Sequence, residues 1–133
     1  MADAVTSQTL IDGPNKAVIK FTNVSDGSGE SAVKKVDVSA LTTNSRGEAC
    51  TSVSIARIYW ACRGMGVDIE FDATTNVLAT TLPADSTGDE YYDLFSGIPN
   101  NAGSGVTGDI DFTTIGHSNG DAYSIILVLN KNF

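Results

Sequence analysis

The stretch VDIEFD, residues 67–72, alternates apolar and acidic side chains without a break. Successive side chains of a β-strand point to opposite faces, so this alternation predicts a strand with one buried and one solvated face. The three apolar side chains would face a core and the three acidic ones would face water. The same period of two recurs at 17–22, 35–39 and 109–113.

Three further runs, at 53–62, 77–82 and 123–129, are apolar on both faces. Strands with two apolar faces are central strands of a sheet or are covered by a neighbouring subunit. Their β-branched and aromatic residues favour strand over helix.

Turn-forming residues separate these runs. The DGSGE segment at 26–30 predicts a hairpin between the strands near Phe21 and Val36. Asn119-Gly120 is a strong hairpin signal, and it predicts that residues 110–115 and 123–129 pair as antiparallel neighbours.

About eight short strands in 133 residues predict one all-β domain over residues 1–133, either an antiparallel β-sandwich or a jelly-roll-like barrel. Residues 1–15 form either a polar N-terminal arm or, at 5–11, a first strand. The glycine-rich stretch 83–107 is expected to be a long loop with a short strand or one helical turn at 89–95.

Four aromatic residues mark a candidate contact surface. Tyr91, Tyr92 and Phe95 lie in the long loop, where they either form a binding surface or cap one end of the core. Trp60 lies on a strand with two apolar faces, which favours a place in the core or at a subunit interface. A sugar-stacking platform is the alternative for Trp60, and it would need a second aromatic residue on the same exposed face.

No set of residues predicts catalysis. His117 is the one histidine, and it stands in a turn beside Ser118 and Asp121, where adjacent side chains rarely form a catalytic relay. The carboxylates cluster at 68–72, at 109–111 and at 89–93, and they are expected to lie on solvated faces, with calcium binding as the alternative. We therefore expect no enzyme activity, no cofactor and no metal.

The two cysteines and the net charge of the chain restrict the chemistry and the classes of binding partner that we expect. Cys50 and Cys62 are expected to be reduced and partly buried, although a disulfide between them stays open. A formal net charge of -8 argues against binding to nucleic acid or to anionic membranes. The N-terminal sequence lacks the pattern of a signal peptide, and no apolar run has the length of a membrane span, so we expect a soluble protein made in the cytosol.

Several stretches together resemble small virion structural proteins of tailed bacteriophages, including phages of aquatic bacteria. The resemblance covers nearly the whole chain and carries no catalytic motif. The stretches are residues 1–9, 18–27, 35–41, 63–69, 103–109 and 120–126.

The resemblance implies a virion protein, assembled in the host bacterial cytoplasm. Within that class we expect a capsid decoration (cement) protein that binds the major capsid protein and itself forms a symmetric homo-oligomer, with a homotrimer favoured. A neck, tail or fibre-associated protein is one alternative, and a carbohydrate-binding module is another.

Overall fold

Nine β-strands form the framework of the computed structural model, which describes residues 4–92 and 97–133. A single turn of 3-10 helix, η1 (Val38–Ala40), lies between the third and fourth strands. The strands are β1 (Ala4–Asp12), β2 (Lys16–Val24), β3 (Val33–Val36), β4 (Ser52–Arg63), β5 (Gly66–Phe71), β6 (Val77–Leu82), β7 (Thr87–Tyr91), β8 (Ile110–Ile115) and β9 (Ala122–Asn132).

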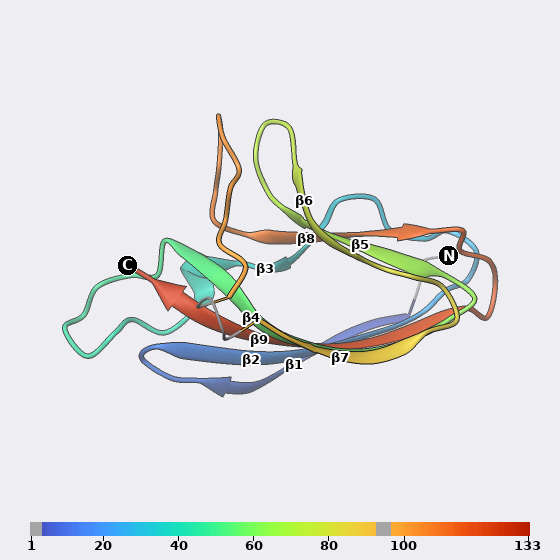
Figure 1. Cartoon of the computed structure of the whole chain (residues 1–133), viewed down its shortest axis with the longest axis horizontal. Helices are drawn as coiled ribbons and strands as arrows, with labels where there is room; N and C mark the ends of the chain where they lie inside the picture. The colour runs from blue at the N-terminus through green and yellow to red at the C-terminus, as the bar shows by residue number, and fades with distance from the viewer. Residues whose placement is uncertain (1–3, 93–96) are drawn as a thin grey trace.

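The strands form two antiparallel sheets that pack face to face (Figure 1). One sheet has five strands in the order β1-β2-β9-β4-β7, and the other has four in the order β3-β8-β5-β6. The predicted all-β sandwich is therefore confirmed, with nine strands instead of about eight. No helix in the described part of the chain is both long and apolar enough to span a membrane.

The core lies between the sheets, and the period-two pattern builds it. On β5, Val67, Ile69 and Phe71 are fully buried, as the alternation predicts. Across the core, the Phe112 ring packs edge to face on Phe21 at 5.3 Å between centroids and on Tyr123 at 5.9 Å. These contacts tie β8 of one sheet to β2 and β9 of the other.

Both predicted hairpins are wrong, because both turns cross from one sheet to the other. β2 pairs with β1 and β9, whereas β3 pairs with β8. Likewise β8 pairs with β3 and β5, whereas β9 pairs with β2 and β4. The apolar faces of β8 and β9 meet across the core, so the two strands cannot also be neighbours in one sheet. The two crossing segments lie side by side, since the Ser25 amide donates to the Asp121 carbonyl at 2.7 Å.

Of the three runs that are apolar on both faces, two are interior strands. β4 and β9 lie inside the five-stranded sheet, as predicted. β6 is an edge strand instead, and Leu78 on it is 52% exposed. Its outer face is exposed to solvent, so the apolar residues on that face do not contribute to the core.

A buried polar group holds the first crossing segment. The Glu30 carboxylate, 7% exposed, accepts hydrogen bonds from Asn23 Nδ2 at 3.0 Å and from Tyr123 Oη at 2.6 Å, and it forms an ion pair with Lys35. A buried carboxylate is tolerated only when it is paired in this way. At the other end of the sandwich, the buried Lys131 ammonium lies 2.5 Å from Asp12 Oδ1.

The sequence left two alternatives open, an arm or a strand at the N-terminus and a strand or a helical turn in the long loop. The structure has a strand in both places. Residues 4–12 form β1, paired along β2, so this part of the predicted arm is a strand. The stretch 83–107 contains β7, which pairs with β4 from Thr87 to Tyr91.

Candidate functional site

The outer face of the five-stranded sheet carries a regular array of side chains from all five strands. Strand register places side chains from all five strands in three rows across it, and each of these side chains is half-buried or exposed. The first row is mainly aromatic and aliphatic, the second mixes charged, aromatic and aliphatic groups, and the third is small and rich in hydroxyls. The rows are Tyr91, Arg57, Val128, Val18, Ile11; then Asp89, Tyr59, Ile126, Lys20, Gln8; then Thr87, Ala61, Ser124, Thr22, Thr6.

At the β4–β7 side of this face, Arg57 lies between two tyrosines. Its guanidinium carbon is 4.5 Å from the ring centroid of Tyr59 and 4.6 Å from that of Tyr91. Its Nε and Nη2 donate to the two carboxylate oxygens of Asp89 at 2.8 and 2.6 Å. We call these four residues, Arg57, Tyr59, Asp89 and Tyr91, the tyrosine–arginine cluster.

The electrostatics of the cluster favour the fully ionised pair. The hydrogen bond to Asp89 raises the pKa of Arg57, and the same bond lowers the pKa of Asp89. The bidentate geometry and the two ring contacts restrict the guanidinium more than a simple surface ion pair would. The cluster is nevertheless open to solvent, since Tyr91 is 55% exposed and the Asp89 side chain 42%.

A shallow hollow of about 210 Å³ adjoins the cluster. Tyr59, Trp60 and Ile126 line it together with the small residues Ala61, Gly88 and Ser124. Gly88 is required there, because a Cβ would meet the Trp60 ring at 2.5 Å. The small side chains of Ala61 and Ser124 leave room beside the Tyr59 ring on an otherwise flat sheet face.

Of the four predicted contact residues, one belongs to this exposed face. Tyr91 lies on it. Trp60 packs against the core from β4 and donates its indole N–H to Ser86 Oγ at 3.0 Å, and part of it also lines the hollow beside Tyr59. Tyr92 also packs against the core, which supports the capping alternative for that residue. Phe95 lies outside the described residues.

Sequence analysis placed Asp89 in a solvated carboxylate cluster but did not identify Arg57 or Tyr59, and a β-bulge in β4 explains the two omissions. The pairing of β4 with β9 shifts register between Ile55 and Arg57, so that Ala56 is an extra residue. In a regular strand, Arg57 and Tyr59 would share the face of the buried Ile55. The bulge turns them outward.

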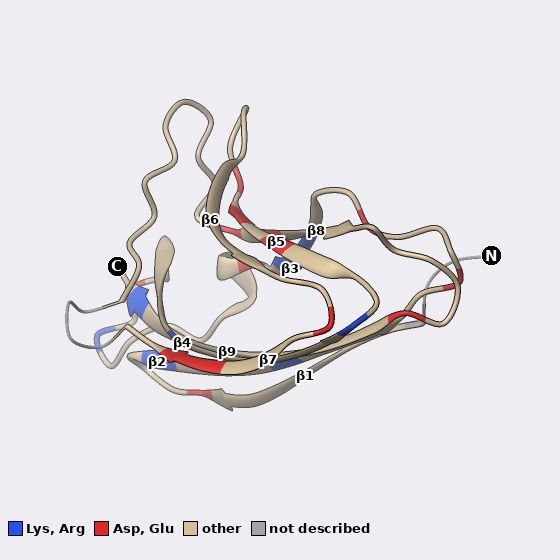
Figure 2. Cartoon of the chain, turned by 45° about the vertical axis from the view of Figure 1, so that its right-hand side comes forward, with Lys and Arg blue, Asp and Glu red and all other residues tan. Residues whose placement is uncertain are grey.

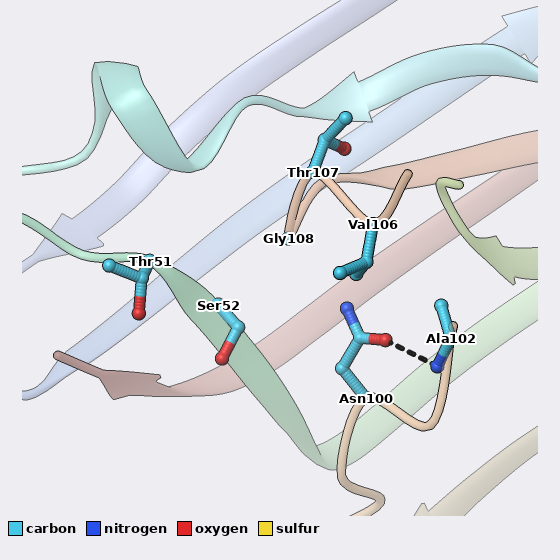
Figure 3. Close-up of a pocket in the computed structure, with 7 residues that line it drawn as sticks. All are labelled: Thr51, Ser52, Asn100, Ala102, Val106, Thr107 and Gly108. Atoms are coloured by element: carbon cyan, nitrogen blue, oxygen red, sulfur yellow. Dashed lines mark hydrogen bonds between the residues drawn. The ribbon is translucent and has the colours of Figure 1, made fainter. Parts of the chain in front are cut away.

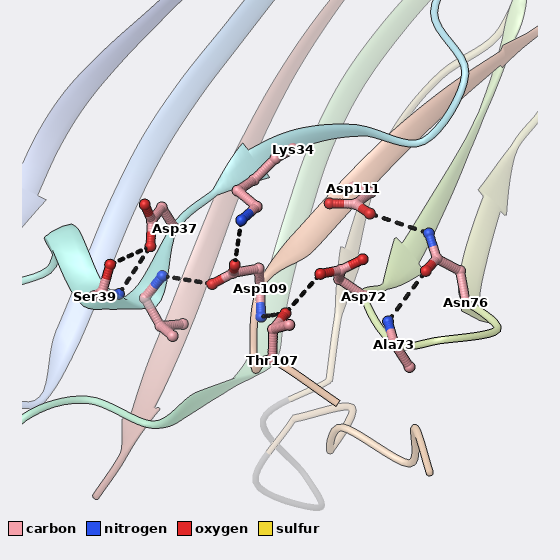
Figure 4. A network of polar contacts seen from close by, with 10 residues as sticks. Lys34, Asp37, Ser39, Asp72, Ala73, Asn76, Thr107, Asp109 and Asp111 are labelled. Carbon is pink, nitrogen blue, oxygen red and sulfur yellow. Dashed lines mark hydrogen bonds and ion pairs between the residues drawn. The ribbon is translucent and has the colours of Figure 1, made fainter. Parts of the chain in front are cut away.

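A second polar cluster lies on the outer side of the four-stranded sheet (Figure 4). The prediction of a solvated face is wrong for Asp109 and Asp111, which are 4% and 3% exposed. The turn after β5 and the loop before β8 cover them, and the Thr74 amide donates to the Ser104 carbonyl at 3.1 Å to join these two segments. The projecting segments are visible above β5 and β8 in Figure 1.

The buried carboxylates are unequally supported. Asp109 accepts from the Val38 amide at 2.9 Å and pairs with Lys34 at 2.9 Å. Asp111 Oδ2 accepts from Asn76 Nδ2 at 3.0 Å, but its Oδ1 is buried and receives no hydrogen bond from the described residues. Burial, followed by a hydrogen bond shared with the Asp72 carboxyl, raises the pKa of Asp111 to about 6.

These carboxylates do not form a metal cage. Within residues 4–92 and 97–133, no three His, Cys, Asp or Glu side chains are arranged to hold an ion. Acidic residues also colour β5 and β7 in Figure 2, on opposite sheets of the sandwich. On β5, Asp68 accepts from the Thr81 hydroxyl at 2.6 Å and Glu70 from the Thr113 hydroxyl at 3.0 Å.

A pocket of about 240 Å³ lies at one end of the sandwich (Figure 3). Thr51, Ser52, Val106 and Thr107 line it, and Asn100 extends into it from the long loop while its Oδ1 accepts from the Ala102 amide at 2.9 Å. The lining offers amide and hydroxyl groups and small apolar side chains, without an ionisable group. It therefore presents no candidate base or nucleophile pair.

The turn at 117–121 does not assemble a catalytic relay. His117 Nδ1 lies 3.2 Å from Thr114 Oγ1, and the ring packs where a Cβ on Gly29 would be. Asp121 Oδ2 accepts from both the amide and the hydroxyl of Ser118, at 2.8 and 3.1 Å. Histidine and serine thus have separate partners, and both interactions stabilise the turn.

The two cysteines are free thiols, as expected, and both are buried. Burial raises the pKa of Cys50 and of Cys62, which keeps them protonated at neutral pH. A buried neutral thiol is a poor nucleophile and a poor metal ligand.

Comparison with known proteins supports the fold but identifies no family. No protein-family model and no curated protein matches the chain. Among solved structures, a mutant of a family 29 carbohydrate-binding module is 13% identical, covers 94% of this chain and 91% of its own, and gives a TM-score of 0.50. A cupin superfamily protein from Desulfitobacterium hafniense is 10% identical, covers 100% of this chain and 82% of its own, and gives a TM-score of 0.37. At these identities the likeness concerns the sandwich fold alone.

Proposed function

We propose that this chain is a non-catalytic carbohydrate-binding domain and that the outer face of its five-stranded sheet binds a glycan. The observation that carries the proposal is the tyrosine–arginine cluster. A sugar ring has an apolar C–H face that packs on an aromatic ring and a rim of hydroxyls that needs polar partners. Tyr59 and Tyr91 supply the first, and Arg57 and Asp89 supply the second.

The rest of the face supports the same ligand. The hollow beside Tyr59 gives a ring room to approach, and the third row adds hydroxyl groups from four strands. The ion pair between Arg57 and Asp89 holds the polar groups in place, so little side-chain entropy is lost on binding. By its name the family 29 module with the similar fold is also a carbohydrate-binding protein. A chain with net charge -8 would repel acidic polysaccharides, so neutral glycans are the expected class.

Affinity gel electrophoresis against a panel of neutral and acidic soluble polysaccharides tests the proposal. The native protein should be retarded by at least one neutral glycan. Tyr91→Ala and Tyr59→Ala should each weaken binding roughly tenfold, about 1.4 kcal/mol, because each removes one stacking surface. Tyr91→Phe keeps the ring and should retain most of the affinity.

Leu78→Ala is the matched control, since it removes an exposed apolar side chain from the other sheet. Equal mobility of the native protein in every gel would contradict the proposal. Retardation that persists in both tyrosine variants would place the ligand elsewhere on the molecule.

A second function, capsid decoration, is supported by the resemblance to phage virion proteins over nearly the whole chain. In this proposal the chain binds the major capsid protein and stabilises the assembled shell by binding energy alone. Its copy number in purified particles of a phage that encodes it is the test. A ratio near one per major capsid protein supports decoration, a much lower ratio supports a neck, tail or fibre position, and absence from the particle removes the virion proposal.

The two proposals are compatible, because a domain on a particle surface has one side available to the shell and another to the surroundings. They fail independently. Loss of glycan binding leaves the copy number untouched, and absence from particles leaves glycan binding untouched.

A further inference from the structure

β1 is exposed to an unusual degree for a strand of nine residues. It is the outermost strand of the five-stranded sheet, so one of its backbone edges pairs with β2 and the other has no neighbour among residues 4–92 and 97–133. Every residue from 5 to 11 is exposed. Three of them are large aliphatic residues, with Val5 45%, Leu10 46% and Ile11 54% exposed.

The edge of β1 also carries no charge. Residues 4–11 read AVTSQTLI, with no charged residue, proline or glycine, in a protein of net charge -8. Protein edge strands usually carry charges, proline or bulges that prevent pairing with another chain. β1 lacks these devices over residues 4–9, where its register with β2 is regular up to the shift after Thr9.

The other three edge strands each carry at least one such device. β7 has Asp89 and Glu90 among its five residues, and β3 has two lysines among its four. β6 is uncharged, but its pairing with β5 shifts register at Ala79, so a bulge interrupts it. The bulge of β1 lies at Leu10, after six uncharged residues in regular register, whereas that of β6 lies in the middle of a six-residue strand, so β1 is the edge best suited to receive a further strand.

We propose that β1 pairs edge to edge, in antiparallel orientation, with β1 of a second copy of this chain. A twofold axis would join two five-stranded sheets into one continuous sheet of ten. The occupant is a second copy because antiparallel self-pairing sets this uncharged segment against itself. Two strongly acidic molecules can then approach without placing like charges opposite each other at the contact.

The side chains that this pairing would place opposite each other are also compatible. Centred on Ser7, it would set Ser7 opposite Ser7 of the second copy, Thr6 opposite Gln8 and Val5 opposite Thr9, each pair on one face of the joined sheet. Cross-strand pairs of this kind, together with backbone pairing over residues 5–9, are the usual source of affinity when a strand is added to a sheet edge. The resulting dimer differs from the trimer expected from the sequence, so the molar mass of the oligomer in solution distinguishes the two.

Light scattering coupled to size exclusion, on the full chain over a dilution series, is the test. The mass should be twice 13.9 kDa at high concentration and should fall toward 13.9 kDa on dilution. Ser7→Lys and Gln8→Lys place a charge on opposite faces of β1, and each should shift the protein to monomer. Leu78→Lys, which puts the same charge on the β6 edge strand, should leave the dimer intact.

A monomer at every concentration, a trimer, or a dimer that survives both lysine substitutions in β1 would overturn the proposal. Circular dichroism of each variant separates loss of pairing from loss of fold, because an exposed edge substitution should leave the β spectrum unchanged. The outcome is independent of glycan binding, which is measured with the tyrosine variants.

Discussion

Replacing Asp111 by asparagine should change how the stability of this protein depends on pH. Asp111 is 3% exposed, and burial followed by the hydrogen bond with Asp72 raises its pKa from 3.8 to about 6. The folded protein therefore holds this proton more tightly than the unfolded chain does. The stabilisation is complete below about pH 4 and is lost as the pH rises through about 6.

The magnitude follows from the size of the shift. One pKa unit corresponds to about 1.36 kcal/mol, so a shift of about two units is worth roughly 2–3 kcal/mol of unfolding free energy. The Asp111→Asn variant cannot ionise there. It keeps an oxygen for Asn76 and gains an amide donor toward Asp72, as the protonated acid does.

Urea denaturation of both proteins from pH 4 to pH 7 measures the effect. At pH 4 the two should be about equally stable, and at pH 7 the variant should be more stable by roughly 2–3 kcal/mol. Taking the difference between the two proteins at each pH cancels the titration of groups that do not interact with Asp111. Asp37→Asn is the control of opposite sign, because hydrogen bonds from Ser39 lower the pKa of Asp37. That substitution should cost stability above about pH 4 and little below it. A difference for Asp111→Asn that is the same at every pH, or a variant less stable than the native protein at pH 7, would refute the reasoning.

Three further changes test the core and the buried polar groups. Phe112→Ala should cost about 3–5 kcal/mol in urea denaturation, because it empties the centre of the sandwich, whereas Leu78→Ala on the exposed face should change stability by less than about 0.5 kcal/mol. Lys131→Met should cost about 3 kcal/mol by leaving the Asp12 carboxylate without its cation, and equal stability would show that water replaces the ammonium. Cys50 and Cys62 should react with a thiol reagent slowly in the folded protein and rapidly in urea, and fast labelling of the native state would contradict their burial.

Much of the fold could be predicted from the sequence because strand periodicity is a local signal. The alternation at 67–72 needs only neighbouring side chains to reveal a half-buried strand. The partners of each strand are not local, and here the prediction failed. The turn containing Asn119-Gly120 has the composition of a hairpin, but the apolar faces on either side of it face each other across the core.

The candidate site was harder to predict for two physical reasons. The bulge at Ala56 reverses the faces of β4, so the sequence alone suggests that Arg57 and Tyr59 lie inward with Ile55. Loops that are distant in sequence cover Asp109 and Asp111, so an alternating pattern that usually marks a solvated face here contains buried carboxylates. Tyr91 was identified because an aromatic residue in a polar, glycine-rich stretch stands out without knowledge of its neighbours.

The most direct test of the central claim is the binding of neutral polysaccharides to the native protein and to Tyr91→Ala under identical conditions. The proposed function predicts that a neutral glycan retards the native protein and that the variant, folded as judged by circular dichroism, loses roughly tenfold in affinity. No retardation of the native protein by any glycan, or retardation of both Tyr91→Ala and Tyr59→Ala equal to that of the native protein, would contradict the assignment of this sheet face as a carbohydrate-binding surface.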